Sequence, residues 1–96
     1  MNVSKTLSNK REDILRISAA HGATNLRVFG SVSRGEATEK SDLDLLINLE
    51  PGRTLLDIIA IKQDLEDLLG CSVDVVTENA VSPYIRDQIL KEAVSL

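Results

Sequence analysis

The chain has 96 residues, of which 43% are hydrophobic and 27% are charged, as in an ordinary globular protein. That length supports a single domain, residues 1–96, and is too short for two separate cores. The formal net charge of −4 argues against a nucleic-acid backbone as the main partner or direct substrate, because such backbones are usually bound by a basic face.

The first predicted element is a helix near the N-terminus. Asn9 and Glu12 have the spacing of a capping box, which places the helix start at Asn9. The helix is expected to run to about His21 and to stop at Gly22. Its buried stripe is predicted to hold Ile14, Ile17 and Ala20.

Two strands are predicted next, with a glycine-rich stretch between them. LRVF, residues 26–29, has the composition of a short strand that ends at Gly30, and LDLLINL, residues 43–49, has that of a second one. A short helix is expected between the two. Pro51 and Gly52 form a typical turn signal after the second strand.

A second long helix is predicted after that turn. Thr54 and Asp57 have the spacing of another capping box, and Gly70 is expected to end the helix just after Leu69. One broad side of this helix is apolar and should be buried; it consists of Leu55, Ile58, Ile59, Leu65, Leu68 and Leu69.

The last two predicted elements are a strand and a helix. SVDVV, residues 72–76, alternates as a strand does, and Ser82 followed by Pro83 is a typical N-cap with the first helical residue. Helices and strands therefore alternate along the chain. This order predicts an α/β (α+β) fold, in which a small mixed β-sheet of three or more strands has helices packed on it.

Three aspartates stand out on the predicted strands. Asp42 and Asp44 point to the same face, because side chains alternate along a strand. The same alternation puts Asp74 on the face opposite Val73 and Val75. If the two strands are neighbours, three carboxylates meet. Oxygen ligands without His or Cys favour Mg²⁺ or Mn²⁺, and paired carboxylates can bridge two such ions.

Each acid also has a purely structural interpretation. Asp42 can be a turn residue at the start of its strand, and Asp74 can be ion-paired or placed at a sheet edge. Taken together on matched faces, the three acids favour a metal site, since three close carboxylates without a cation would raise one another's pKa.

The stretch after the first strand, GSVSRG, offers groups that bind phosphate. Gly30 allows close approach of the backbone, Ser31 brings a hydroxyl, and Arg34 brings a forked guanidinium. Gly30 and Gly35 have the spacing of the glycines in a Walker A loop, but the Lys and Ser/Thr of that motif do not follow. A Walker A loop is therefore excluded.

Gly30-Ser31, ten further residues and then Asp42-Leu43-Asp44 resemble the G-S-x(10)-D-x-D signature of the DNA polymerase β-like nucleotidyltransferase superfamily. The longer stretch FGSVSRGEATEKSDLDLLI is similar to the version in minimal nucleotidyltransferase (MNT) proteins. The resemblance covers essentially the whole chain, as far as the third acid at Asp74. It implies the polymerase β-like nucleotidyltransferase fold.

The resemblance implies a catalytic and metal-binding role for the three acids. Asp42 and Asp44 match the acids that hold two Mg²⁺ ions, for which Mn²⁺ can substitute. Asp74 matches the third carboxylate, a ligand of the catalytic metal that helps to deprotonate the acceptor hydroxyl. In such a site one ion activates the acceptor while the other stabilises the leaving group.

The resemblance also assigns the glycine-rich stretch to nucleotide binding. Gly30 and Ser31 match the pair that contacts the β- and γ-phosphates, and Arg34 stands where family members often place a phosphate-binding arginine. The implied substrate is a nucleoside triphosphate, ATP. The implied reaction is in-line attack of an acceptor hydroxyl on the α-phosphate, with release of pyrophosphate.

Short MNT proteins resemble the antitoxin half of HEPN/MNT toxin–antitoxin pairs. The resemblance implies transfer of AMP to a tyrosine hydroxyl of a HEPN ribonuclease toxin, within a hetero-oligomer that neutralises the toxin. The chain has only Phe29 and Tyr84 as aromatic residues and no evident acceptor site, so the partner should supply one. Four apolar residues of the last helix are expected either to dock that partner or to pack on the sheet: Tyr84, Ile85, Ile89 and Leu90.

Two other functions stay open. One is a catalytically silent binding module that neutralises the HEPN partner by contact, and the other is a small-molecule nucleotidyltransferase. The intact acids and the Gly30-Ser31 pair favour an enzyme over a binding module. The missing acceptor region argues against a free-standing enzyme for small molecules.

The sequence also predicts where the protein acts. Its N-terminus has no apolar signal region, and no segment approaches the ~18 apolar residues of a membrane span. The single cysteine, Cys71, cannot form an internal disulfide, which fits a reducing compartment. These features predict a soluble, cytoplasmic protein.

Overall fold

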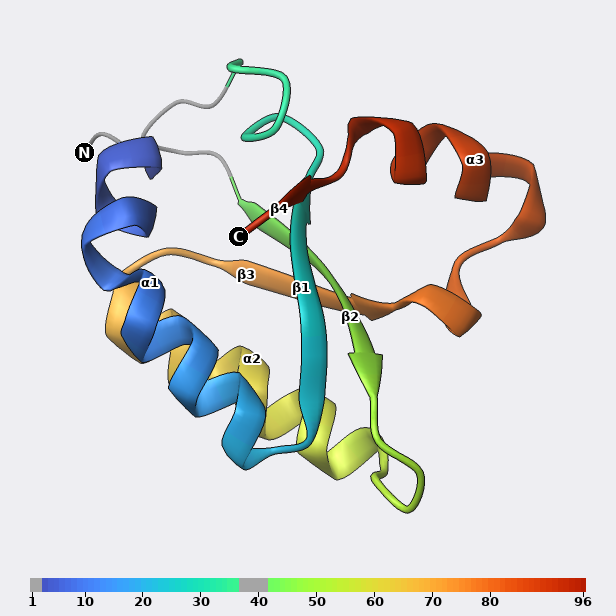
Figure 1. Cartoon of the computed structure of the whole chain (residues 1–96). Helices are drawn as coiled ribbons and strands as arrows, with labels where there is room; N and C mark the ends of the chain where they lie inside the picture. Colours follow the sequence, from blue (N-terminus) through green and yellow to red (C-terminus); the bar gives the residue numbers. More distant parts are fainter. Residues whose placement is uncertain (1–2, 37–41) are drawn as a thin grey trace.

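The computed structural model of the chain describes residues 3–36 and 42–96 (Figure 1). Its longer elements lie close to the predicted positions. In chain order the elements are α1 (Val3–Ala20), β1 (Ala23–Phe29), β2 (Leu43–Leu49), α2 (Leu55–Leu69), β3 (Val73–Thr77), the 3₁₀ turn η1 (Glu78–Ala80), α3 (Pro83–Glu92) and β4 (Val94–Ser95).

The four strands form one mixed sheet in the order β3-β2-β1-β4, which confirms the predicted fold class. β1 runs antiparallel to both β2 and β4, whereas β2 and β3 run parallel. Parallel strands need a crossover connection, and α2 provides it. The sequence did not reveal β4, because two residues are too few to show an alternating pattern.

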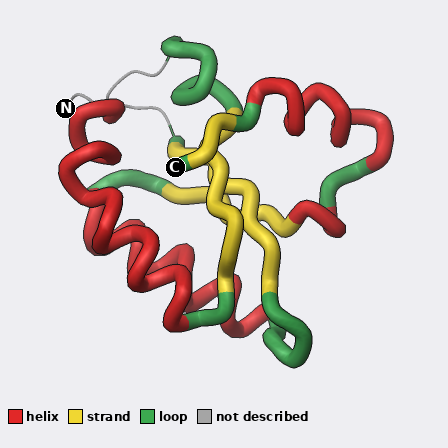
Figure 2. Tube along the Cα trace, viewed as in Figure 1, coloured by secondary structure: helices red, strands yellow, loops and turns green. Residues whose placement is uncertain are grey.

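The two long helices, α1 and α2, cover one face of the sheet, and α3 lies on the other side (Figures 1 and 2). The core fills the covered side. β2 contributes Leu43, Leu45 and Ile47 to it, all with 1% exposure or less. These residues alternate along the strand, so Asp44 points to the opposite face, where α3 lies.

The limits of α2 confirm the predicted caps. Thr54 accepts a hydrogen bond from the backbone at the helix start, and Asp57 accepts one from the Thr54 N–H, so the capping box is complete. Gly70 ends the helix in the left-handed region, at φ +70°.

The predicted buried side of α2 is only partly correct. Leu65 and Leu69 are buried, but Leu55 and Ile59 are 67% and 41% exposed, and the fully buried Ile61 was not predicted. Apolar residues occupy more than one side of this helix. The sheet covers only the stripe spaced by four residues, Ile61, Leu65 and Leu69.

The prediction that α1 starts at Asn9 is wrong. The helix begins at Val3, and Asn9 is an exposed residue inside it. Leu7 is buried in the core one heptad before Ile14, so packing extends the helix toward the N-terminus and overrides the local cap signal. Ala20 is exposed, and the buried position one turn after Ile14 belongs to Ser18.

The short helix predicted after β1 does not form over residues 30–36, which make turns instead. Gly30 and Gly35 both adopt positive φ, at +74° and +72°, and such residues interrupt a right-handed helix. The remaining part of that stretch, 37–41, lies outside the described residues.

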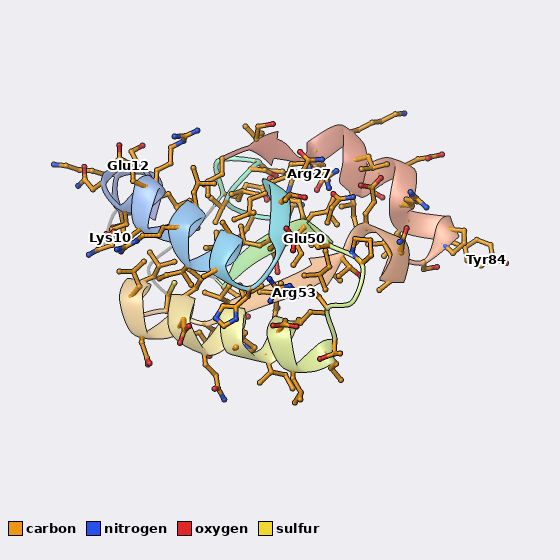
Figure 3. The ribbon with its side chains drawn as sticks, turned by 60° about the horizontal axis from the view of Figure 1, so that its bottom comes forward. Lys10, Glu12, Arg27, Glu50, Arg53 and Tyr84 are labelled. Carbon is orange, nitrogen blue, oxygen red and sulfur yellow. The ribbon has the colours of Figure 1, made fainter. Side chains whose placement is uncertain are left out.

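Helix α3 begins as predicted, with Ser82 accepting a hydrogen bond from Tyr84 N and Pro83 at the first position. None of its residues is buried: Tyr84, Ile85 and Leu90 are exposed, and Ile89 is half-buried. Ile85 and Ile89 line a groove together with Phe29 and Val75 of the sheet, so this helix packs on the sheet only loosely. Tyr84 is 98% exposed and points away from the body of the protein (Figure 3). In the part of the chain that the structure describes, no helix is long and apolar enough to cross a membrane.

We expect the two leucines Leu65 and Leu56 of α2 to differ sharply in their effect on stability. Leu65 has 0% exposure and Leu56 has 75%. Leu65→Ala should lower the free energy of unfolding by about 2–5 kcal/mol, because it leaves a cavity in the core. Leu56→Ala should change it by less than about 0.5 kcal/mol. Urea denaturation measures both, and equal losses would contradict the described packing.

Candidate active site

The parallel pairing of β2 with β3 places two of the predicted acids side by side. Asp44 and Asp74 are direct register partners across the two strands. Neighbouring strands lie only about 4.8 Å apart, so the two side chains, on the same face, are in contact. Asp42 stands at the exposed position just before β2, two residues from Asp44 and on its side. The structure therefore brings all three predicted acids to one region.

The electrostatics of this region are unfavourable without a cation. Burial raises the pKa of Asp44 above its ordinary value, and the carboxylates of Asp74 and Asp42 raise it further. A hydrogen bond with Asp74 acts in the same direction, and the Arg34 guanidinium opposes it. The two neighbouring carboxylates raise the pKa of Asp44 because like charges close together disfavour its ionised form.

The donor chemistry of the acids suits a hard divalent cation. Asp42, Asp44 and Asp74 offer only carboxylate oxygens, the ligands that Mg²⁺ and Mn²⁺ prefer. Among the described residues, no three acidic, histidine or cysteine side chains already converge as tightly as in a formed metal centre. Asp42 and Asp74 are exposed and Asp44 is half-buried, and these three are the residues that could hold a metal here.

Gly30 lies directly over Asp44. It follows Phe29, the last residue of β1, and Phe29 is the register partner of Asp44. A β-carbon at position 30 would collide with Asp44 Oδ2. Gly30 was predicted to allow close approach of the backbone. A glycine is needed here because the backbone turns at φ +74° and passes close to the carboxylate.

A small hydrogen-bond network shapes the turn after Gly30. The carbonyl oxygen of Gly30 accepts hydrogen bonds from Ser33 Oγ at 2.9 Å and from the Arg34 N–H at 3.2 Å. The carbonyl oxygen of Ser31 accepts one from the Glu36 N–H at 2.9 Å. Ser33 was not among the predicted site residues, although its place between the two glycines is a turn signal.

Arg34 is exposed and already paired with acids. Its Nε lies 3.2 Å from Glu36 Oε2, and its Nη1 lies 3.2 Å from Glu92 Oε2 on α3. The hydrogen bond that Arg34 donates to Glu36 is the largest cause that raises the pKa of Arg34. A phosphate group can reach this half-exposed guanidinium by replacing Glu36, which is 64% exposed, and the less exposed Glu92.

A groove of about 530 Å³ opens beside the acids, between the sheet and α3. Asp44 and Asp74 lie in its wall. The rest of the lining is mostly apolar and comprises Phe29, Lys62, Val75, Val76, Ala80, Val81, Ser82, Ile85 and Ile89. A second hollow of about 250 Å³ shares Phe29 with the groove and includes Gly30 and Arg34. Neither Phe29 nor Lys62 was predicted as part of the site wall, because no local pattern marks either residue.

The sequence model of the family described as "Nucleotidyltransferase domain" matches residues 8–96. The chain is 41% identical over 86 residues to a "Putative protein adenylyltransferase" of Methanocaldococcus jannaschii, and this match covers 90% of this chain and 92% of the relative. The chain is also 38% identical over 91 residues to "Protein adenylyltransferase MntA" of Thermococcus cleftensis, and that match covers 86% of this chain and 92% of the relative. The chain belongs to this family of nucleotidyltransferases, as the GS and DxD elements predicted.

Solved structures support the same fold. A "putative minimal nucleotidyltransferase" is 54% identical, with a TM-score of 0.87 over 96% of this chain and 94% of that one. A crystal structure of a variant of the toxin–antitoxin MntA–HpeT has 25% identity and a TM-score of 0.72, over 93% of this chain and 70% of that one. The predicted membership among minimal nucleotidyltransferases is confirmed, whereas the roles of single residues stay predictions.

We expect Asp44→Asn to stabilise the metal-free protein at neutral pH. The pKa of folded Asp44 is raised, so its charge opposes folding at pH values above that pKa. The gain should appear as a melting temperature a few degrees higher in a chelating buffer. It should vanish below the ordinary aspartate pKa of about 3.9, where the wild-type side chain is protonated in both states.

The matched control is Asp67→Asn, which changes an exposed acid of α2 and should leave the melting temperature unchanged. A lower melting temperature for Asp44→Asn than for the wild type would contradict the described repulsion.

Two glycines of the turn provide a matched pair of variants. Gly30→Ala and Gly35→Ala both place a side chain at positive φ, which costs about 1–2 kcal/mol. At Gly30 the new β-carbon meets Asp44, whereas at Gly35 no atom of residues 3–36 or 42–96 lies within 4 Å of it. Gly30→Ala should therefore abolish binding of a non-hydrolysable ATP analogue in calorimetry, and Gly35→Ala should retain it. Equal affinities would show that the approach to Asp44 is unimportant.

Proposed function

We propose that this nucleotidyltransferase transfers AMP from ATP to a hydroxyl group of a HEPN ribonuclease toxin, with tyrosine as the expected acceptor, and so acts as its antitoxin. The observation that carries the proposal is the pairing of Asp44 with Asp74 directly under Gly30. It supports a site that is complete for a metal-bound triphosphate. The same site is open on the side where an acceptor would enter.

In the proposed reaction, Asp42, Asp44 and Asp74 hold two Mg²⁺ ions, with Mn²⁺ as a substitute. Once bound, the ions supply charge neutralisation on the phosphates and lower the pKa of the acceptor hydroxyl. Asp74, an exposed residue in the groove wall, would help to accept the proton of that hydroxyl. Asp44, which is half-buried, would help to hold the ions that keep the α-phosphate in line with the attacking oxygen.

The turn after β1 would hold the rest of the nucleotide. The backbone at Gly30 comes close enough to contact the β- and γ-phosphates, and Ser31 offers its hydroxyl there. Arg34 would exchange Glu92 and Glu36 for phosphate oxygens, which its forked guanidinium can bind in pairs. Pyrophosphate would leave on this side, opposite to the acceptor.

Two observations support a protein as the acceptor. The relatives at 41% and 38% identity carry the name protein adenylyltransferase, and one structural neighbour is a toxin–antitoxin complex. Helix α3 leaves Tyr84 and Ile85 98% and 50% exposed beside the groove. Exposed apolar side chains of that size fit a partner that covers them and brings its own hydroxyl to the acids.

The direct test is incubation of the protein with the HEPN partner, Mg²⁺ and labelled ATP, followed by mass spectrometry. We expect an AMP adduct on the partner and loss of its ribonuclease activity. Asp44→Asn and Asp74→Asn should slow the transfer by about 10²-fold or more, as loss of a charge-stabilising group typically does. Asp67→Asn on the exposed side of α2 is the matched control and should be fully active.

Three outcomes are informative. If Asp44→Asn neutralises the partner fully and forms no adduct, the protein acts as a binding module and not as an enzyme. Labelling of a small hydroxyl compound in place of the partner would favour a small-molecule nucleotidyltransferase. Formation of the adduct after metal ions have been removed with a chelator, before ATP is added, would contradict the metal-dependent mechanism.

A further inference from the structure

The outer edge of β3, next to the active site, is covered by side chains from α2. β3 is an edge strand and has a neighbouring strand, β2, on one side only. On that side the carbonyl oxygen of Ser72 accepts a hydrogen bond from Leu43 N at 2.9 Å. Backbone polar groups of successive residues point to alternate sides of a strand, so the N–H and C=O of Val73 point away from β2. Nothing in the sheet can bind them.

Lys62 and Glu66 bind both of these groups. Lys62 Nζ donates to the carbonyl oxygen of Val73 at 2.6 Å, and Glu66 Oε2 accepts from the Val73 N–H at 3.0 Å. The two side chains lie one helical turn apart and also pair with each other, with Nζ and Oε2 3.2 Å apart. The residue directly before Asp74 is thus held at both of its backbone polar groups.

The Lys62 ammonium also faces the candidate site. Its Nζ lies 4.0 Å from Asp74 Oδ1, and Lys62 lines the groove together with Asp44 and Asp74. An ammonium group has three N–H donors, and here Val73, Glu66 and Asp74 lie around it. The ammonium donates hydrogen bonds to Glu66 and Val73, and it lies beyond hydrogen-bond distance of Asp74, whose charge it attracts. This arrangement favours a role in holding Asp74 over direct binding of a phosphate.

We propose that Lys62 and Glu66 are positioning residues for nucleotidyl transfer: they fix β3 at Val73 and so keep the Asp74 carboxylate in register with Asp44. This inference rests on the proposed catalytic role of Asp74. Without the two side chains, the edge strand would be unsupported at the point from which the acid projects. Loss of such outer partners of a metal-binding carboxylate typically costs about 10–100-fold in activity.

Three variants and one control test the proposal. Lys62→Met removes the ammonium and keeps the stem, and Glu66→Ala removes the acceptor for Val73 N. Glu66→Gln retains an acceptor oxygen and should rescue most of the function. Gln63→Met places the same new residue at an exposed position of the same helix and serves as the control.

The kinetic readout is AMP transfer to the HEPN partner. Lys62→Met and Glu66→Ala should lower kcat by about 10–100-fold and leave KM for ATP unchanged, because the triphosphate site is intact. The structural readout is amide hydrogen exchange in the metal-free protein. Exchange at Val73 should become faster in both variants, while the amides of β1 stay as protected as in Gln63→Met.

The combined results separate the positioning role of Lys62 and Glu66 from the proposed role of Asp74. If Val73 exchanges faster but kcat is that of the control, or if kcat falls while exchange at Val73 is unchanged, the positioning role is overturned. If Asp74→Asn is inactive while Lys62→Met is fully active, this inference fails and the proposed function stands. If Asp74→Asn is fully active, the proposed role of Asp74 fails and the inference falls with it.

Discussion

The parallel pairing of β2 with β3 is the constraint on which the site depends. Asp44 and Asp74 are 30 positions apart in the chain, yet the register makes them neighbours. That register is specified by the buried face of the same strands, where Leu43 and Val73 are partners with 1% and 0% exposure. A slip by one residue would turn the acids into the core and the leucines out of it. The apolar side of the sheet therefore determines the geometry of the acidic side.

The face of the sheet that carries the acids lowers the stability of the fold. Burial and like charge raise the pKa of Asp44, and Gly30 leaves just enough room for its carboxylate. Such local conflict is typical of sites that bind a cation and a charged substrate. The covered side of the sheet offsets it with a close-packed core, which includes the fully buried Ile61 and Leu65.

Helix α3 is attached differently from the other two helices. It has no buried residue, and ion pairs tie it to the sheet side. Near its start, Glu78 lies 3.1 Å from both Arg27 of β1 and Arg86 of α3, and the hydrogen bond from Arg27 is the main cause that lowers the pKa of Glu78. Near its end, Glu92 pairs with Arg34 of the turn after β1. The Arg27 and Glu78 side chains are only 12% and 23% exposed, so this contact is partly buried and holds α3 on the sheet side although the helix has no buried residue of its own.

Elements with strong local signals, and the family, could be predicted from the sequence. The caps at Thr54 and Gly70 depend on nearby residues and were correctly predicted, and the spacing from Gly30 to Asp42 correctly indicated a nucleotidyltransferase. What depends on distant contacts became visible only in the folded chain. The tertiary structure extends α1 past Asn9 because Leu7 enters the core, and it leaves Tyr84 exposed because the sheet does not reach it. It also brings Lys62 to Asp74, since a residue of α2 reaches a sheet edge only once the chain has folded.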